Sequence, residues 1–298
     1  MKRNETAERL NEKIAKLIDK VESAGSWVKP FKTSIANGVP LNIKTGKPYQ
    51  GINIFNLLDE ADSNGYSTNI WGTFKQWKEE GYKIKKGEKS TEIYFFKPLK
   101  ITMTDTETGE EEEKTIPMLK RYVVFNRDQT DAPAIEKPER NKVSIIEHAE
   151  RFYSAVDYLE VHQANKAYYS NSGDYIGIPD ISDFISAEEY YSTLGHEHIH
   201  ATGHSSRLNR PKGAKFGSAA YAYEELIAEI GSVILMAHLG LEAEPVQDNS
   251  AAYLRSWLQS LKDDPKQLWK AASEASKAAN YIIDHAESAL MFGAAETA

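Results

Sequence analysis

Hydrophobic positions along the chain follow two different periods, which separate predicted helices from predicted strands. Over residues 3–23, apolar side chains recur every three or four positions, which is the period of an amphipathic helix. Shorter helices are predicted over 53–65 and 72–82. Residues 90–104 and 114–126 are rich in β-branched and aromatic side chains and predict two strands with an acidic turn between them. The first part of the chain is therefore expected to be α+β.

The second part of the chain carries mostly helical patterns. Helices are predicted over 144–160, 184–200 and 221–240, and at least two more follow before the C-terminus. Two short strands are predicted over 166–170 and 174–180. Two interpretations of the second strand stay open: an edge strand that pairs with an extended peptide, or a strand of the core.

A stretch without periodicity separates the two parts. Residues 131–142 contain two prolines among charged side chains, which is typical of a linker. The fold class that we expect is therefore α+β, with two domains. An α+β domain covers residues 1–130, the linker covers 131–142, and a mostly helical domain covers 143–298.

Composition narrows the class of protein. The chain has 298 residues, enough for two domains, and its hydrophobic content of 41% supports buried cores. No run of roughly 18 apolar residues occurs, so neither a membrane span nor a membrane partner is expected. The first residues are charged and lack the apolar core of a signal peptide. The chain has no cysteine, which fits a cytoplasmic protein and leaves histidine and carboxylate side chains as metal ligands.

The net charge of −8 is unevenly distributed. Residues 1–142 contain 25 Lys and Arg against 22 Asp and Glu, whereas the remaining residues contain 11 against 22. The most basic stretch is 29–100, with 12 against 7. An acidic chain can still bind DNA, because phosphates respond to the local field rather than to the net charge.

The basic stretch also holds many aromatic side chains. Proteins that bind single-stranded nucleic acid use such mixtures, because cations follow the phosphates and rings stack on bases. The alternative is that the rings belong to the core, and this is favoured for Trp71, Phe74 and Trp77. The candidate contacts with DNA are Lys44, Lys47, Tyr49, Lys75, Lys85, Lys86 and Lys89.

The sequence H-E-x-x-H occupies residues 196–200, within a predicted helix. Residues four apart lie on one helix face, so His196 and His200 can bind one metal ion. In zinc enzymes the ion lowers the pKa of a bound water from ~16 to about 7, and a nearby glutamate accepts its proton. Glu197 is the candidate for that catalytic role. The alternative is a solvated helix with scattered histidines, because the motif is short.

A catalytic zinc site needs a third protein ligand. A histidine six residues after His200 would complete the metzincin pattern, but that position is Ser206. A glutamate on the next helix is the other option, as in gluzincins, and Glu224, Glu225 and Glu229 are available. In several families of that type, a residue four positions after the ligand glutamate hydrogen-bonds to a ligand histidine. This spacing favours Glu225 as ligand and Glu229 as its hydrogen-bonding helper; the reverse assignment stays open.

Several long segments resemble one known family. "PLNIKTGKPYQGIN", "WGTFKQWKEEGYKIKKGEKSTEIYFFK" and "RYVVFNRDQTD" are similar to the N-terminal domain of ArdC-type antirestriction proteins, which is shared with some plasmid conjugation primases. "YYSTLGHEHIHATGHSSRLNR" and "FGSAAYAYEELIAEIG" resemble the metallopeptidase domain of the same family, in the same order. The resemblance implies an N-terminal domain that binds single-stranded DNA and a C-terminal zincin-like metallopeptidase fold.

The resemblance also implies a function. The protein would be encoded on a conjugative or other mobile element and would protect incoming DNA from host restriction. Its cofactor would be Zn²⁺, with Mn²⁺ or another divalent metal as the alternative. Its partners would be single-stranded DNA and an unidentified protein substrate. The alternative function is a non-enzymatic protein that coats single-stranded DNA and has a structural metal site.

Overall fold

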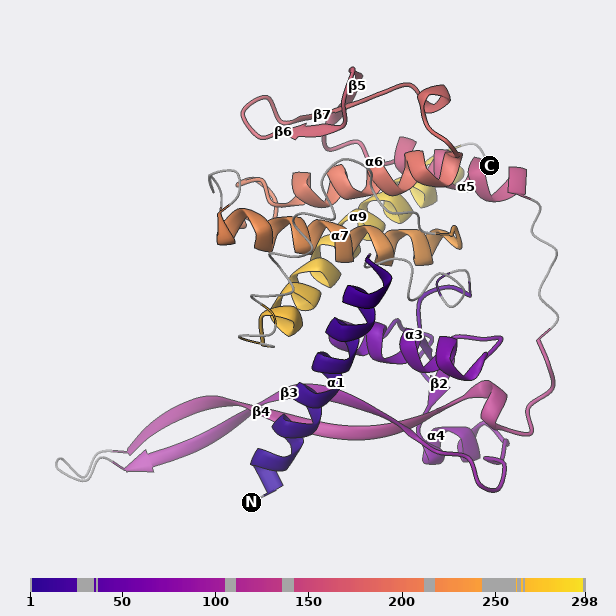
Figure 1. Cartoon of the computed structure of the whole chain (residues 1–298), viewed down its shortest axis with the longest axis vertical. Coiled ribbons are helices and arrows are strands. Elements are labelled where there is room, and N and C mark those ends of the chain that lie inside the picture. Colours follow the sequence, from indigo (N-terminus) through magenta and orange to yellow (C-terminus); the bar gives the residue numbers. More distant parts are fainter. Residues whose placement is uncertain are drawn as a thin grey trace.

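The computed structural model describes residues 2–25, 35, 37–104, 111–135, 142–211, 218–242, 261, 264 and 266–296. These residues form helices and two small sheets, and the predicted α+β class is confirmed (Figure 1). None of the described helices is long and apolar enough to cross a membrane. The helices are α1 (Lys2–Ala24), α3 (Ile52–Asn64), α4 (Phe74–Glu79), α5 (Lys142–Ser154), α6 (Ala187–Thr202), α7 (Ala219–Leu239) and α9 (Lys266–Glu296). The strands are β1 (Leu41–Asn42), β2 (Ile70–Gly72), β3 (Thr91–Thr104), β4 (Glu111–Asn126), β5 (Glu160–Gln163), β6 (Tyr168–Ser170) and β7 (Tyr175–Ile178).

The N-terminal sheet has four strands in the order β1-β2-β4-β3. Strands β3 and β4 pair antiparallel from Thr91↔Val124 to Thr104↔Glu111. They form a long ribbon whose outer part extends away from the rest of the molecule (Figure 1). At its inner end the ribbon packs on the buried ring of Trp71. The two long predicted strands are confirmed, whereas β1 and β2 are too short to leave a pattern in the sequence.

A second sheet, of order β5-β7-β6, lies over helix α6 (Figure 1). Its central strand β7 is parallel to β5 and antiparallel to β6. Both edges of β7 are therefore paired, and the interpretation of residues 174–180 as an edge strand for a peptide is wrong. The helix predicted over 144–160 ends at Ser154, and Glu160 begins strand β5.

Buried apolar side chains from both halves of the chain form one continuous core. Helix α3 contributes side chains such as Phe55, and α7 contributes side chains such as Ile230. A hydrogen bond also joins the halves, because the Gly51 N–H donates to Ser276 Oγ at 2.9 Å. The two halves therefore stabilise each other.

The predicted division into domains at 131–142 stays a prediction. Residues 131–135 belong to no helix or strand, and residue 142 already begins α5. The intervening residues 136–141 lie outside the described part of the chain.

Glycines allow α6 to pack closely on both α7 and α5. A Cβ atom at Gly231 of α7 would lie 2.6 Å from Ile199 Cδ1 of α6, and one at Gly195 of α6 would lie 2.7 Å from the Tyr153 hydroxyl of α5. Real Cβ atoms do not approach other atoms so closely, so a larger residue would force the helices apart. The contact at Gly231 sets the distance between α7 and the helix that carries the H-E-x-x-H motif.

Arg207 ties the second sheet to the end of α6. Its guanidinium donates to the Asp174 carboxylate, to the Tyr169 hydroxyl at 3.1 Å and to the Ala201 carbonyl at 2.7 Å. It also lies 5.1 Å from the ring centroid of Tyr158. The hydrogen bond from Arg207 is the main cause that lowers the pKa of Asp174 from 3.8 to about 2. The sheet is therefore held to the motif helix by an ion pair with additional hydrogen bonds.

Replacing Asp174 with Asn tests this link. Asp174 has a φ of 52°, and Asn tolerates that backbone conformation, so the variant mainly loses the charge. We expect the free energy of unfolding at pH 7 to fall by about 1 kcal/mol, because the pair with Arg207 is partly exposed to solvent.

The difference should depend on pH in one direction. Because the pKa of Asp174 is lower in the folded protein, its charge stabilises the fold. This stabilisation is fully present above pH 3.8, the ordinary pKa, and is lost as the pH falls through about 2. Urea unfolding of Asp174→Asn and wild type should therefore give a difference that shrinks as the pH is lowered from 5 towards 3. A difference that is constant with pH would show that the charge of Asp174 does not matter.

Candidate functional site

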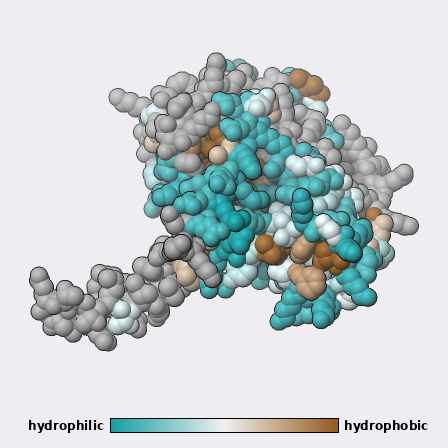
Figure 2. Space-filling view, turned by 60° about the horizontal axis from the view of Figure 1, so that its bottom comes forward, coloured by the Kyte–Doolittle hydropathy of each residue, from teal (hydrophilic) through white to brown (hydrophobic). Residues whose placement is uncertain are grey.

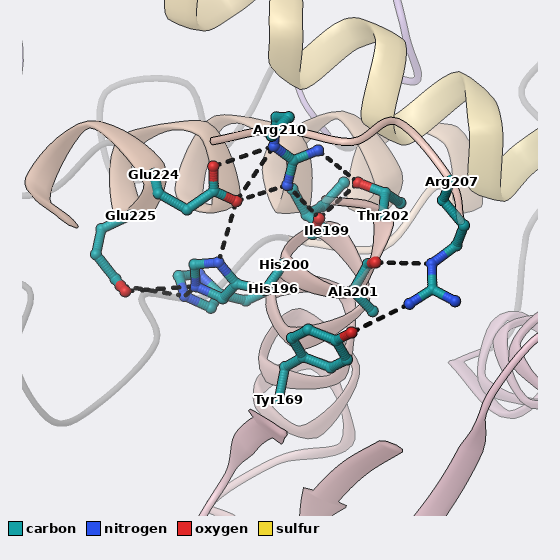
Figure 3. A network of polar contacts seen from close by, with 10 residues as sticks. All are labelled: Tyr169, His196, Ile199, His200, Ala201, Thr202, Arg207, Arg210, Glu224 and Glu225. Carbon is teal, nitrogen blue, oxygen red and sulfur yellow. Dashed lines mark hydrogen bonds and ion pairs between the residues drawn. The ribbon is translucent and has the colours of Figure 1, made fainter. Parts of the chain in front are cut away.

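Three side chains from α6 and α7 meet at one point (Figure 3). His196, His200 and Glu225 each offer one ligand atom, and these atoms all lie within 4.8 Å of one another. His196 Nε2 is 3.5 Å from Glu225 Oε2, and His200 Nε2 is 3.5 Å from Glu225 Oε1. The two Nε2 atoms are 3.1 Å apart. Two imidazoles and one carboxylate form the ligand set that suits a catalytic zinc-type site.

The helix starts help to place these side chains. Ser186 caps α6 through its hydroxyl, and the helix continues through the motif, so His196 and His200 lie one turn apart on one face. Ser218 caps α7 in the same way and places Glu225 in the second turn. Both helices are thus regular where they carry the three side chains.

The charges of the site stabilise one another. Burial would lower the pKa of His200, but the carboxylates of Glu224 and Glu225 outweigh burial and raise it to about 10. Burial opposes the charge of His196 too, and the hydrogen bond with Glu225 brings the pKa of His196 above its ordinary value. Burial would raise the pKa of Glu225, but the two imidazoles hold it well below its usual range. Positive charge is therefore favoured beside Glu225, and a divalent cation would replace the protons of the two imidazoles.

A second carboxylate contacts His200 on the other side of its ring (Figure 3). His200 Nδ1 is 3.4 Å from Glu224 Oε1. Arg210 holds Glu224 through two bonds, at 2.6 Å from Nη2 and 3.0 Å from Nε. The same guanidinium donates to Thr202 Oγ1 and to the Ile199 carbonyl, both at 2.7 Å. Glu224 is thus fixed in place, and it in turn orients the imidazole of His200.

The part played by Arg210 and Glu224 could not be found from the sequence. Arg210 lies beyond the end of α6 and Glu224 in the second turn of α7, so only the folded chain brings them together. A weak signal existed, because Glu224 directly precedes Glu225 on an otherwise apolar helix. A carboxylate that is largely buried on such a helix needs a partner, and Arg210 is that partner for Glu224.

The other acidic and histidine side chains of these helices lie in different environments. Glu197 is mostly buried, at 8% exposure. His198 is fully buried against the ring of Tyr153, and burial lowers its pKa to about 3, so it packs as a neutral ring. Glu229 is buried, which raises its pKa, and the carboxylate of Glu225 acts in the same direction. The roles of Glu197 as base and of Glu229 as helper or ligand stay predictions.

The lysines that were predicted to contact DNA are exposed, but several have partners. Lys44 pairs with Glu80 at 3.2 Å, and Lys75 pairs with Glu79 at 3.7 Å. The Lys85 ammonium donates to a backbone carbonyl at 2.9 Å. The remaining candidates on the surface are Lys47, Lys86 and Lys89. Contact of these six lysines with DNA stays a prediction.

Two expectations about aromatic residues need correction. Tyr49 is 5% exposed and its hydroxyl accepts a hydrogen bond from Asn42, so its ring is not free to stack on a base. Phe74 was expected in the core but is 62% exposed, at the first position of the six-residue helix α4. Trp71 and Trp77 are fully buried, as expected.

Both halves of the chain are similar to known protein families. Residues 4–125 match the family described as the N-terminal domain of anti-restriction factor ArdC, and residues 147–274 match zincin-like metallopeptidases. The uncharacterized protein y4eC of Sinorhizobium fredii is 36% identical over 247 residues, which are 82% of this chain and 80% of the relative. A DNA primase TraC of Escherichia coli is 36% identical over 291 residues, 92% of this chain. The matched region spans only 27% of the primase.

Solved structures give the same result. A metal-free crystal structure of the antirestriction protein ArdC from plasmid R388 matches with a TM-score of 0.72 and 39% identity, over 94% of this chain and 97% of that one. The Mn(II)-bound structure of that protein matches with a TM-score of 0.68 and 37% identity, over 93% and 97%. The likenesses extend over nearly the whole chain and include both halves, which confirms the resemblance seen in the sequence. The chain therefore belongs to the ArdC family of antirestriction proteins.

Proposed function

We propose that this protein protects the incoming DNA of a mobile element from host restriction. Its N-terminal half binds single-stranded DNA, and its C-terminal half holds a divalent metal ion between His196, His200 and Glu225. The observation that carries the proposal is the convergence of these three side chains in a chain of the ArdC family. DNA binding is supported by the match of residues 4–125 to the N-terminal ArdC domain and by the exposed lysines of residues 29–100.

The ligand set fits Zn²⁺, and Mn²⁺ is the alternative. Two histidines and a glutamate form a ligand set of catalytic zinc sites, with room for a water or substrate atom. ArdC from plasmid R388 has been crystallised both metal-free and with Mn(II). When bound, such an ion supplies Lewis-acid chemistry and lowers the pKa of water.

Five side chains of this protein have a role in the proposed site, either in metal binding or in proton transfer. His196, His200 and Glu225 hold the ion. Glu224 accepts the Nδ1–H of His200 and keeps its Nε2 directed towards Glu225. Glu197 follows His196 directly on α6 and accepts a proton as general base. The reaction that these groups support best is hydrolysis of a peptide bond in a protein substrate.

Metal binding should stabilise the folded protein and should depend on Glu225. A ligand at 100 times its dissociation constant that binds only the folded state adds about 2.7 kcal/mol to the free energy of unfolding. Protein stripped with EDTA should therefore melt at a higher temperature after Zn²⁺ or Mn²⁺ is added. The Glu225→Gln variant should lose most of this increase, because a neutral amide binds the ion more weakly than a carboxylate.

Glu229→Gln is the matched control, because it makes the same substitution one turn further along α7. In equilibrium dialysis this variant should bind one ion per chain, as the wild type does. Loss of binding in Glu229→Gln alone would support the reverse assignment of ligand and helper. Full binding by both variants would rule out a ligand role for either glutamate.

Glu197→Gln separates chemistry from binding. The amide keeps the shape of the side chain but cannot accept the proton, so metal and single-stranded DNA should bind as in the wild type. In a conjugation assay with a restricting recipient, protection of the transferred DNA should fall to the level seen without the protein. Intact protection would instead favour the non-enzymatic protein that coats single-stranded DNA and has a structural metal site.

A further inference from the structure

Two aromatic rings are exposed next to each other on the β3–β4 ribbon. Phe95 and Tyr122 are each 37% exposed, and their ring centroids lie 5.7 Å apart with the planes at 75°. Ile93 lies directly opposite Tyr122 in the strand register, and Phe95 follows two residues after Ile93. Because side chains alternate along a strand, all three lie on one face of the ribbon.

This face changes from buried to exposed along the ribbon. Near the body of the protein, Ile93 and Val124 pack against Trp71. Two residues further along each strand, on the same face, Phe95 and Tyr122 are open to solvent. Figure 2 brings the ribbon side of the molecule forward and shows a mainly hydrophilic surface with small hydrophobic patches.

Two lysines flank the exposed rings. The Lys97 ammonium lies 6.0 Å from the centroid of Tyr122, and Lys120 is directly opposite Phe95 in the strand register. Neither lysine forms an ion pair within the described part of the chain. We call Phe95, Lys97, Lys120 and Tyr122 the ribbon face. It combines two accessible rings with two cations that are not neutralised by a carboxylate.

We propose that the ribbon face binds single-stranded DNA, with bases stacked on Phe95 and Tyr122 and phosphates next to Lys97 and Lys120. The proposal rests on the DNA binding proposed above and assigns it to a surface. Unpaired bases expose the flat faces that rings stack on, whereas bases inside a duplex already stack on each other. The acidic sequence of residues 110–113 repels phosphates, which limits the contact to the inner half of the ribbon.

A competing surface lies on helix α4. Phe74 is 62% exposed there and is followed by Lys75, one of the lysines predicted from the sequence. Lys75 pairs with Glu79, whereas the lysines of the ribbon face have no such partner among the residues that the structure describes. This difference favours the ribbon face, and it makes Phe74 and Lys75 matched controls of the same residue types.

Fluorescence anisotropy of a labelled oligo(dT) with the full-length protein tests the rings. Stacking on one aromatic side chain changes the affinity of single-stranded DNA by about tenfold or more. We therefore expect Phe95→Ala and Tyr122→Ala each to weaken binding about tenfold. Phe74→Ala should change it by less than about twofold. Binding of the same sequence as a duplex should be weaker and should not depend on the rings.

The contribution of Lys97 and Lys120 can be tested in variants that keep both aromatic rings. Each phosphate contact contributes ~0.7 to the slope of log affinity against log salt for single strands. The Lys97→Ala, Lys120→Ala double variant should therefore have a slope that is shallower by about 1.4. Lys75→Ala should leave the slope unchanged. This variant pair gives a result even if removal of a ring were to disturb the fold.

The outcomes separate the two proposals. If the wild type fails to bind oligo(dT), the proposed DNA binding itself is wrong. If the wild type binds and the ribbon variants, with unchanged melting temperatures, bind equally well, the assignment to the ribbon face is overturned. Loss of affinity in Phe74→Ala or Lys75→Ala would move the site to α4. A changed oligomeric state with unchanged DNA affinity would make the ribbon a contact between copies of the chain.

Discussion

A single buried guanidinium connects the parts of the candidate metal site. Arg210 is 5% exposed and donates to the Glu224 carboxylate, to the Thr202 hydroxyl and to the Ile199 carbonyl. A charge buried so deeply is tolerated only when its donors are satisfied, and removing one partner of such a pair costs about 3–5 kcal/mol. The last turn of α6 and the second turn of α7 are therefore held together by one hydrogen-bond network centred on the Arg210 guanidinium.

The metal ligands are positioned by this network and by close packing. Glu224 fixes the imidazole of His200, and the contact between Gly231 and Ile199 sets how near α7 approaches α6. Glu225 then lies 3.5 Å from both imidazoles of the motif. We propose that the site is preformed, so that an ion can enter and leave without refolding the chain.

Local patterns in the sequence predicted many of the helices and strands. They did not predict contacts between residues that are far apart in the sequence. Helical spacing placed His196 and His200 on one face, and the spacing of acidic residues favoured Glu225, because both patterns depend on a single helix. The partnership of Arg210 with Glu224 depends on how two helices meet, which no local pattern records. Helix α4 is similarly too short for its period to show which face is buried. Phe74 was expected in the core because it lies three residues before Trp77, which is the spacing of a packed stripe, but only Trp77 is buried.

The central claim is that His196, His200 and Glu225 together hold one divalent ion. Diffraction data collected at the zinc absorption edge, from crystals grown with Zn²⁺, would test it most directly. We predict one anomalous peak per chain, about 2.0–2.2 Å from the Nε2 atoms of both histidines and from a carboxylate oxygen of Glu225. Glu224 should remain bound to Arg210. A peak coordinated by Glu229 or Glu224 in place of Glu225, or none at these histidines while the protein binds zinc in solution, would contradict the claim.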